Sequence, residues 1–430
     1  MKKAAALLAL LAPVFLLSAC NDDDDPPPEA KAYVRVVHAS PDAPAVDVTL
    51  DGAAVVSGAA FKAATGFATT TAGAHAIKVN VAGSATTVLS ANPTLTKDRY
   101  YTVFAANKVA SLEPLVVEED GVAPTAGNIK LRVVHAAPSA PNVDVYVTAP
   151  GAALGSATLS NVAFKGVSDA LQVPAGDYRV RVTPTGSSTV VYDSGTLSLA
   201  AGANLVAAAV DASTGNSPVS LLVLTRDAAA PVFEVSDKQA KVRAVHASPD
   251  APAVDILVDD AEVAGDVSFP ADTGYLSLLA KTYNFKVNAA NTATSVIDAD
   301  VALEAGKRYS VIAANLLASI EPLVLDDTTA TPAAGKAKLR IVHLSPDAGL
   351  VDVLANDAEL AGDVAFKDAT GYLEVDAGDY AVKVNAAGTA TTAISGNVTL
   401  LSGKIYSVYA VGSAAGGATN PLDLKVLTDN

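Results

Sequence analysis

Apolar and polar residues alternate with a period of two along most of the chain. In the segment 34–38, Val34, Val36 and His38 share one face while Arg35 and Val37 share the other, and the segment 46–50 alternates in the same way. A strand points successive side chains to opposite faces, so this period is typical of β-structure. After the first twenty residues, no segment keeps a helical period with capping residues. The pattern therefore predicts an all-β protein.

One motif occurs four times. In each copy an arginine precedes a histidine by three residues and an aspartate by twelve, and three copies carry a further aspartate between them. The copies contain Arg35, His38, Asp42 and Asp47; Arg132, His135 and Asp144; Arg243, His246, Asp250 and Asp255; and Arg340, His343, Asp347 and Asp352. The second copy has Ser139 in place of the middle aspartate, and the fourth has Gly349 in place of a proline. Fixed spacing of this kind indicates a tandem repeat.

The spacing beyond the motif sets the module boundaries. The next shared phenylalanine follows the histidine by 23 residues in three copies and by 29 in the second, which indicates a six-residue insertion near 149–151. We expect modules at 32–117, 129–226, 240–326 and 337–430, each large enough to bury its own core. The linkers between them are rich in Pro, Gly, Ala, Thr and Asp. Such linkers favour modules that hang as separate beads.

Turn signals refine the fold. Asp51 and Gly52 form a two-residue hairpin turn signal between alternating segments, and residues 259–260 and 356–357 occupy the equivalent place. Tyrosines follow turns at strand starts, as in the tyrosine corner of immunoglobulin domains. These are Tyr178, Tyr309 and Tyr380. With about seven short strands per module, the sequence predicts four tandem immunoglobulin-like antiparallel β-sandwiches.

The segment Val34–Val48 (VRVVHASPDAPAVDV) strongly resembles a bacterial family of domains of unknown function, numbered forty-three ninety-seven. The resemblance covers all four modules, from about residue 32 to the end of the sequence. It implies a protein that is exported or anchored at the cell envelope, where members of this family often occur in tandem. It implies no established activity.

The first twenty residues indicate export. Lys2 and Lys3 precede an apolar run at 4–17, which is too short to span a bilayer comfortably. The run ends in Leu-Ser-Ala-Cys, which resembles the lipobox of bacterial lipoproteins. We expect removal of 1–19, lipidation of Cys20 and an acidic, proline-rich tether at 20–31. Because Asn21 is not the aspartate that retains lipoproteins in the inner membrane, we expect the outer membrane. The periplasmic and surface leaflets stay open, and the alternative is an ordinary secretory signal with an incidental cysteine.

Composition excludes several classes of function. Lys and Arg total 29 against 45 Asp and Glu, so the net charge of -16 argues against nucleic-acid binding. With Cys20 as its one cysteine, the chain cannot form an internal disulfide or a cysteine zinc site. The sequence has no calcium loop, zinc-protease motif, phosphate loop or nucleophile elbow. We therefore expect no cofactor and no enzymatic activity.

The repeated histidine and aspartate leave three roles open: a structural contact with the turn, a metal or ligand site, and acid–base catalysis. Arg35 and Asp47 fall on the face opposite His38, so we expect a diagonal ion pair if their strands are neighbours. Asp42 suits an Asx turn. His75 occupies a place that other modules fill with tyrosine, which indicates a strand position that accepts a ring.

Two hypotheses of function follow, and a third is weaker. In the first, the modules form a noncatalytic rod for adhesion, protein interaction or envelope architecture, reaching on the order of 120–140 Å from the membrane. Its partners are the membrane, through lipidated Cys20, and an unknown protein or glycan. In the second, each module binds a small ligand, glycan or divalent cation through the His/Asp turn. The third is an envelope enzyme of unknown type.

Overall fold

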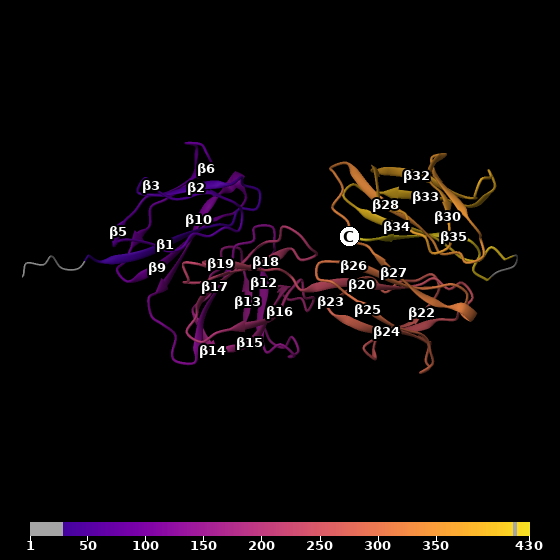
Figure 1. Ribbon diagram of the computed structural model, residues 1–430, viewed down its shortest axis with the longest axis horizontal. Helices are drawn as coiled ribbons and strands as arrows, with labels where there is room; N and C mark the ends of the chain where they lie inside the picture. The colour runs from indigo at the N-terminus through magenta and orange to yellow at the C-terminus, as the bar shows by residue number, and fades with distance from the viewer. Residues whose placement is uncertain (1–28, 416–418) are drawn as a thin grey trace, which may run out of the picture.

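The computed structural model describes residues 29–415 and 419–430 and contains four β-sandwich modules (Figure 1). The expected signal peptide, Cys20 and most of the tether lie outside the described residues. No helix among the described residues is long and apolar enough to cross a membrane. The two helices in this part of the chain are single 3-10 turns, η1 (Val109–Ser111) and η2 (Leu317–Ser319).

The strands of modules 1 and 2 have the following bounds. Module 1 contains β1 (Lys31–His38), β2 (Val46–Leu50), β3 (Ala53–Ala59), β4 (Ala68–Thr71), β5 (Gly73–Ala74), β6 (Ile77–Val81), β7 (Thr87–Ala91), β8 (Thr94–Leu95), β9 (Arg99–Ala106) and β10 (Glu113–Asp120). Module 2 contains β11 (Asn128–His135), β12 (Val143–Thr148), β13 (Leu159–Val162), β14 (Leu171–Pro174), β15 (Gly176–Pro184), β16 (Tyr192–Leu199), β17 (Asn204–Asp211), β18 (Val219–Leu224) and β19 (Val232–Val235).

Modules 3 and 4 repeat this order. Module 3 contains β20 (Gln239–His246), β21 (Val254–Val258), β22 (Ala261–Val267), β23 (Leu276–Leu279), β24 (Thr282–Ala289), β25 (Ser295–Ala302), β26 (Arg308–Ala314) and β27 (Glu321–Asp326). Module 4 contains β28 (Lys336–His343), β29 (Val351–Ala355), β30 (Ala358–Val364), β31 (Leu373–Asp376), β32 (Gly378–Ala386), β33 (Thr392–Leu400), β34 (Ile405–Val411) and β35 (Asp423–Thr428).

Each module packs two sheets against each other. One sheet contains the motif strand, in the order β10-β9-β1-β4 for module 1, and we call it the pairing sheet. The other, β3-β2-β6-β7, is the outer sheet. Modules 3 and 4 have the same two strand orders, and the pairing sheet of module 2 gains a fifth strand, β19. The prediction of an all-β fold built from tandem sandwich modules is confirmed.

The motif strand has one parallel neighbour in every module. β1 runs parallel to β9, with Val36 opposite Val103, and β11, β20 and β28 pair in parallel with β17, β26 and β34. The other strand pairings are antiparallel, as expected. Residue alternation gives the face of each side chain but not the direction of the neighbouring strand, so this pairing was not predictable from the period.

Both faces of the pairing sheet are buried. In β1, Val34 and Val36 face the core of module 1, while Val37 belongs to a second cluster with Phe104. Residues of module 2 such as Leu222 complete that second cluster. A strand covered on both sides carries an almost continuous apolar run, which explains the composition of the motif strand.

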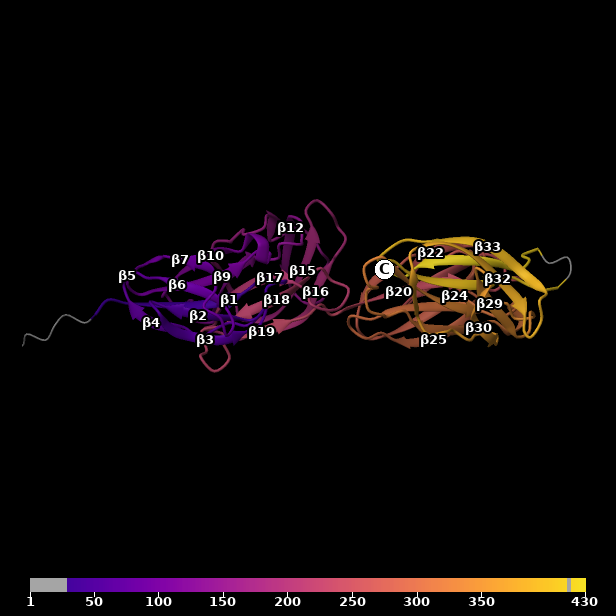
Figure 2. The same ribbon diagram turned by 90° about the horizontal axis from the view of Figure 1, so that it is seen from above.

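The modules therefore pack in pairs through their pairing sheets. One apolar cluster joins modules 1 and 2, and a corresponding cluster containing Val245, Ile312, Val342 and Tyr409 joins modules 3 and 4. In both views the two pairs follow one another along the long axis of the molecule (Figures 1 and 2). The expectation of separate beads is wrong for modules within a pair. Because the modules lie in pairs, the length expected for four modules in a line is wrong as well.

The segments expected as linkers are partly built into the sheets. β10 continues to Asp120, and β19 lies inside the segment 226–240, where Val235 is buried in the core of module 2. At the junction of the two pairs, the side-chain amide of Asn216 donates to the carbonyl oxygens of Gly306 and Lys307, at 3.0 and 3.2 Å. The two pairs are thus in direct contact.

The two-residue turns have the backbone that their residues require. Asp51 and Gly52 have φ values of 51° and 84°, and the equivalent residues 259–260 and 356–357 also have positive φ. Two consecutive positive φ values characterise the type I′ turn, whose twist matches that of a hairpin. The turn signals in the sequence therefore predicted these hairpins correctly.

Candidate functional site

The motif histidine is buried at the end of its strand and uses both ring nitrogens. The Nε2–H donates to a backbone carbonyl six residues later, and Nδ1 accepts from the backbone N–H two residues later. The Nε2–O distances are 3.1 Å (His38–Pro44), 3.0 Å (His135–Pro141), 3.0 Å (His246–Pro252) and 2.8 Å (His343–Gly349). The Nδ1 contact measures 3.3 Å in every copy.

These bonds describe a neutral ring with its proton on Nε2. Burial lowers the pKa of all four motif histidines below the ordinary value of 6.5, and the carbonyl acceptor only partly offsets this effect. Each ring also meets a phenylalanine edge-on, at centroid distances of 6.2–6.4 Å. Because the acceptor is a backbone carbonyl, Gly349 serves as well as proline. This explains why the fourth copy tolerates that replacement.

The last aspartate of the motif ties a bulged strand end to the turn of a neighbouring hairpin. In module 3, Asp255 accepts from the backbone N–H groups of Asp266, at 2.9 Å, and Asn291, at 2.7 Å. These two groups belong to the β21–β22 and β24–β25 hairpins. The other modules use Asp47, Asp144 and Asp352 in the same way. In all four copies the carboxylate is occupied by backbone donors.

The middle aspartate fixes the loop after the strand parallel to the motif strand. Asp42 and Asp250 accept the backbone N–H groups of Val109 and Leu317, each at 2.7 Å, at the two 3-10 turns. Asp347 accepts from Ala414 at 2.8 Å. In the second module the donor and the acceptor of this contact change places.

There the motif residue Ser139 donates its backbone N–H, and Asp211, at the end of the strand parallel to the motif strand, accepts it at 3.2 Å. The contact explains how the second copy retains the loop without the middle aspartate.

The expected ion pair between Arg35 and Asp47 is wrong. Their strands lie in different sheets, because β1 pairs with β4 and β9 while β2 pairs with β3 and β6. Arg35 instead donates through Nε to Thr102, at 2.8 Å, and through a terminal nitrogen to the carbonyl oxygen of Thr225 in module 2, at 2.5 Å. The motif arginine therefore lies at the interface between modules.

In modules 3 and 4 the arginines form a reciprocal buried network. Arg243 of module 3 pairs with Asp429 of module 4 at 2.6 Å, and Arg340 of module 4 pairs with Asp327, which follows module 3. All four residues are at most 3% exposed. Each carboxylate also accepts hydroxyl groups from the module that carries it. These donors are Tyr275 and Ser310 for Asp327, and Tyr372 and Ser407 for Asp429.

The first pair of modules has a rearranged version of this network. Arg226 occupies the place in module 2 that Asp327 and Asp429 hold in modules 3 and 4, and it lies 3.6 Å from Glu119 of module 1. Arg132 turns away to the carbonyl oxygen of Ser168, at 2.9 Å, and is only half-buried. Three motif arginines thus serve the module interface, and the second does not.

Sequence reasoning did not identify the acidic residues of this network. Asp327 and Asp429 lie just beyond the last strand of each module, outside the motif, and one of them falls in an expected linker. A signal was present, since a Ser or Thr follows the arginine by 67 residues in three modules: Thr102, Ser310 and Ser407.

His75 makes the same kind of contact as the tyrosines that replace it. Its Nε2 donates to the carbonyl oxygen of Thr71, four residues earlier, at 2.8 Å. Tyr178 and Tyr380 donate their hydroxyls to carbonyl oxygens four residues earlier as well. Asp51, 2.6 Å from Nδ1, raises the pKa of His75.

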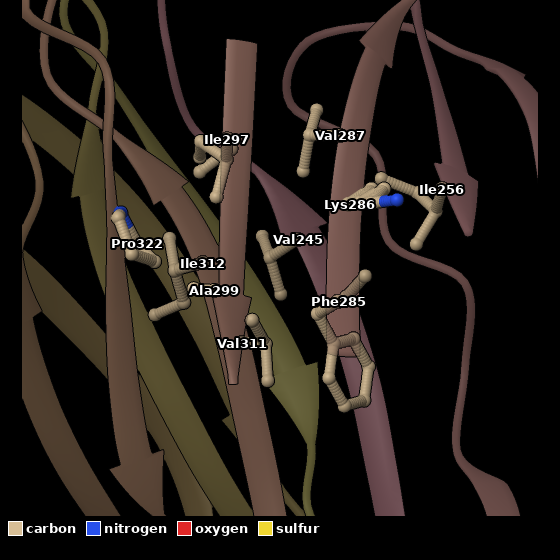
Figure 3. A pocket seen from close by; sticks show the side chains of 12 residues that line it. Val245, Ile256, Phe285, Lys286, Val287, Ile297, Ala299, Val311, Ile312 and Pro322 are labelled. Carbon is tan, nitrogen blue, oxygen red and sulfur yellow. The ribbon is translucent and has the colours of Figure 1, made fainter. Parts of the chain in front are cut away.

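The described residues contain no group of three or more His, Cys, Asp or Glu side chains that could hold a metal ion. Two pockets border the motif, one of about 580 Å³ beside Asp250 and Asp347 and one of about 270 Å³ beside His38. In the core of module 3, side chains such as Phe285, Ile297 and Val311 surround a cavity of only about 10 Å³ (Figure 3). Such a space holds at most about one water molecule.

The comparisons identify a family. A model of the family described as Domain of unknown function (DUF4397) matches residues 32–146, 147–236, 240–354 and 345–430. No curated protein matches the chain.

Among solved structures, the Bacillus anthracis TIE protein is similar at 11% identity and a TM-score of 0.17, over 85% of this chain and 65% of that one. A streptococcal virulence factor described as binding alpha-glucan is similar at 13% identity and a TM-score of 0.14, over 40% and 92% of the two chains. BcpA, the major pilin subunit of Bacillus cereus, is similar at 10% identity and a TM-score of 0.12, over 67% and 99%. Scores this low carry no argument about function.

Proposed function

Because the chain belongs to the DUF4397 family, whose description assigns no activity, we propose a function from the geometry of its repeated motif. The protein is a noncatalytic, lipid-anchored component of the cell envelope. Its paired β-sandwich modules serve adhesion, protein interaction or envelope architecture.

One observation carries the proposal: the polar atoms of the motif form hydrogen bonds that build the modules and join them in pairs. Both histidine nitrogens and the last aspartate are bound to backbone groups in all four copies, and three of the four arginines bind at module interfaces. A histidine bound through both ring nitrogens has no free atom for acid–base chemistry or metal binding, and each oxygen of the last aspartate already accepts a backbone N–H. The same bonds argue against the alternative in which the His/Asp turn binds a ligand, glycan or cation.

The anchoring part of the proposal depends on Cys20. We expect the Cys20→Ala protein to leave the membrane fraction for the soluble fraction, because a lipidated cysteine is the anchor proposed for this chain. Membrane association equal to that of the natural protein would contradict the lipid anchor.

Accessibility separates the envelope roles. We propose to treat intact cells and cells with a permeabilised outer membrane with proteinase, and to follow the tagged protein. Digestion on intact cells would support adhesion or another surface interaction. Protection until permeabilisation would reject adhesion and retain a periplasmic architectural role, and resistance in both would contradict an envelope location.

A further inference from the structure

A pocket of about 270 Å³ opens into one end of the module 1 sandwich. It lies between the ends of β2 and β3 and the loop 60–65, and its walls include the inward side chains of Val36, Val48 and Val79. The equivalent positions in module 3, occupied by residues 244, 256 and 287, line the cavity of about 10 Å³ (Figure 3). The same part of the fold is therefore open in one module and almost filled in another.

The four internal copies show which side chains make the difference. At the end of β3, module 1 carries Gly58 and Ala59, where the other modules carry a larger polar residue followed by valine. The equivalent pairs are Asn161-Val162, Asp266-Val267 and Asp363-Val364. These valines pack into or against the cores of their modules, with Val267 and Val364 at most 9% exposed. Module 1 has the smaller Ala59 where the other modules place this valine.

The lining selects an uncharged, apolar ligand. No Asp, Glu, Lys or Arg lines the pocket, and its polar side chains are those of His38, Ser57 and Thr65. The ring nitrogens of His38 are bound to backbone groups, and the hydroxyl oxygen of Thr65 accepts the backbone N–H of Val36 at 3.0 Å. A charged ligand would lose its hydration here without a partner to replace it.

The volume sets the size of the ligand. An apolar cavity of about 150 Å³ binds benzene, so the present pocket is large enough for a fused two-ring molecule or a branched aliphatic chain. We propose that module 1, unlike the other three modules, binds a small apolar molecule of this size. This inference does not depend on the envelope role, and either can fail without the other.

The test uses indole as the probe and the full chain as the protein. Saturation-transfer NMR should show binding of indole. The ring C–H signals of His38 should shift on titration, because this ring lines the pocket, while those of His246 and His343 should not. Absence of binding at millimolar indole would overturn the proposal.

Closing the mouth provides the decisive variant. Ala59→Val introduces the residue that the other three modules carry, and it should weaken indole binding at least about tenfold. The matched control is Ala264→Val, the same substitution in β22 of module 3, where module 1 itself carries Val56. Binding should be unchanged in this control.

A second variant keeps the test decisive if Ala59→Val fails to fold. Val48→Ile is suitable, because Val48 lines the pocket and the equivalent residue of module 3, Ile256, lines the almost filled cavity. It should also weaken binding. Indole affinity equal to that of the natural protein in a folded Ala59→Val or Val48→Ile protein would reject the pocket as the site.

Discussion

At the scale of single residues, the motif histidine acts as a fixed donor and acceptor that joins a strand end to its turn. We predict that His343→Gln lowers the stability of module 4 by roughly 1–3 kcal/mol, because one glutamine cannot replace both hydrogen bonds of the ring. Calorimetry of the full chain should show an earlier unfolding transition. If the His343→Gln protein unfolds in the same transition as the natural protein, this role of the ring is contradicted.

The same histidines should make stability dependent on pH. Burial lowers their pKa below 6.5 in the folded state, so the unfolded chain binds protons first as the pH falls. The contribution of the four rings is complete above about pH 6.5 and is lost as the pH falls toward the lowered pKa. Calorimetry at pH 7.5 and 5.0 should show lower stability at the acidic pH.

A double variant isolates this effect. His246→Gln with His343→Gln should reduce the pH dependence, since glutamine does not titrate. His75 works in the opposite direction, because Asp51 raises its pKa: its contribution is present below about pH 6.5 and is lost as the pH rises through the raised pKa. His75→Gln should therefore leave the loss of stability at acidic pH in place. Equal pH dependence in the natural protein, the double variant and the His75→Gln protein would contradict the assignment of this loss to the motif histidines.

The sequence identified the motif residues but not all of their partners. A period of two assigned Arg35 and Asp47 to one face, yet whether two such residues meet depends on which strands are neighbours. That order is set by tertiary structure. The histidine contact was foreseeable, because its partners lie within six residues along the chain.

At the scale of elements, each last motif aspartate holds two hairpins of the outer sheet in register. We predict that Asp255→Asn destabilises module 3 by about 1–3 kcal/mol, since an amide presents a donor where two N–H groups require acceptors. The measurement is the unfolding transition of the full chain. Asp169→Asn, at an exposed aspartate, is the matched control and should have no effect. Equal effects of the two substitutions would contradict the capping role.

Hairpins and strands were the most predictable elements, because their signals are local. Asp51-Gly52 gives a turn by its own backbone preference. The parallel pairing of β1 with β9 joins residues far apart along the chain, such as Val36 and Val103, and no local preference encodes it. The apolar residues on both faces of β1 were a visible sign that the strand is covered twice.

At the scale of the whole molecule, buried charges join modules 3 and 4. We predict that Arg243→Gln costs about 3–5 kcal/mol, because it leaves the carboxylate of Asp429 buried without its cationic partner. The comparison is Arg132→Gln, at the motif arginine that is half-buried and away from the charge network, where the loss should be small. Unfolding transitions of both variants provide the test, and similar losses would reject the interface role of Arg243.

The paired arrangement also determines how far the protein reaches. Four modules in a line would extend on the order of 120–140 Å, whereas two pairs in succession span two module lengths, roughly 60–70 Å. Small-angle scattering of a chain beginning at residue 29 should give a pair-distance distribution whose maximum dimension is close to the shorter length. A distribution extending to the longer value would show that the modules separate in solution.

Arg243→Gln combined with Arg340→Gln gives this measurement its control. If buried charges hold the second pair together, the distribution should lengthen in this variant while modules 1 and 2, which retain Arg226 and Glu119, stay joined. An unchanged distribution would mean that the apolar cluster around Val245 and Tyr409 is sufficient for pairing. The charges would then serve to select which modules pair rather than to hold them together.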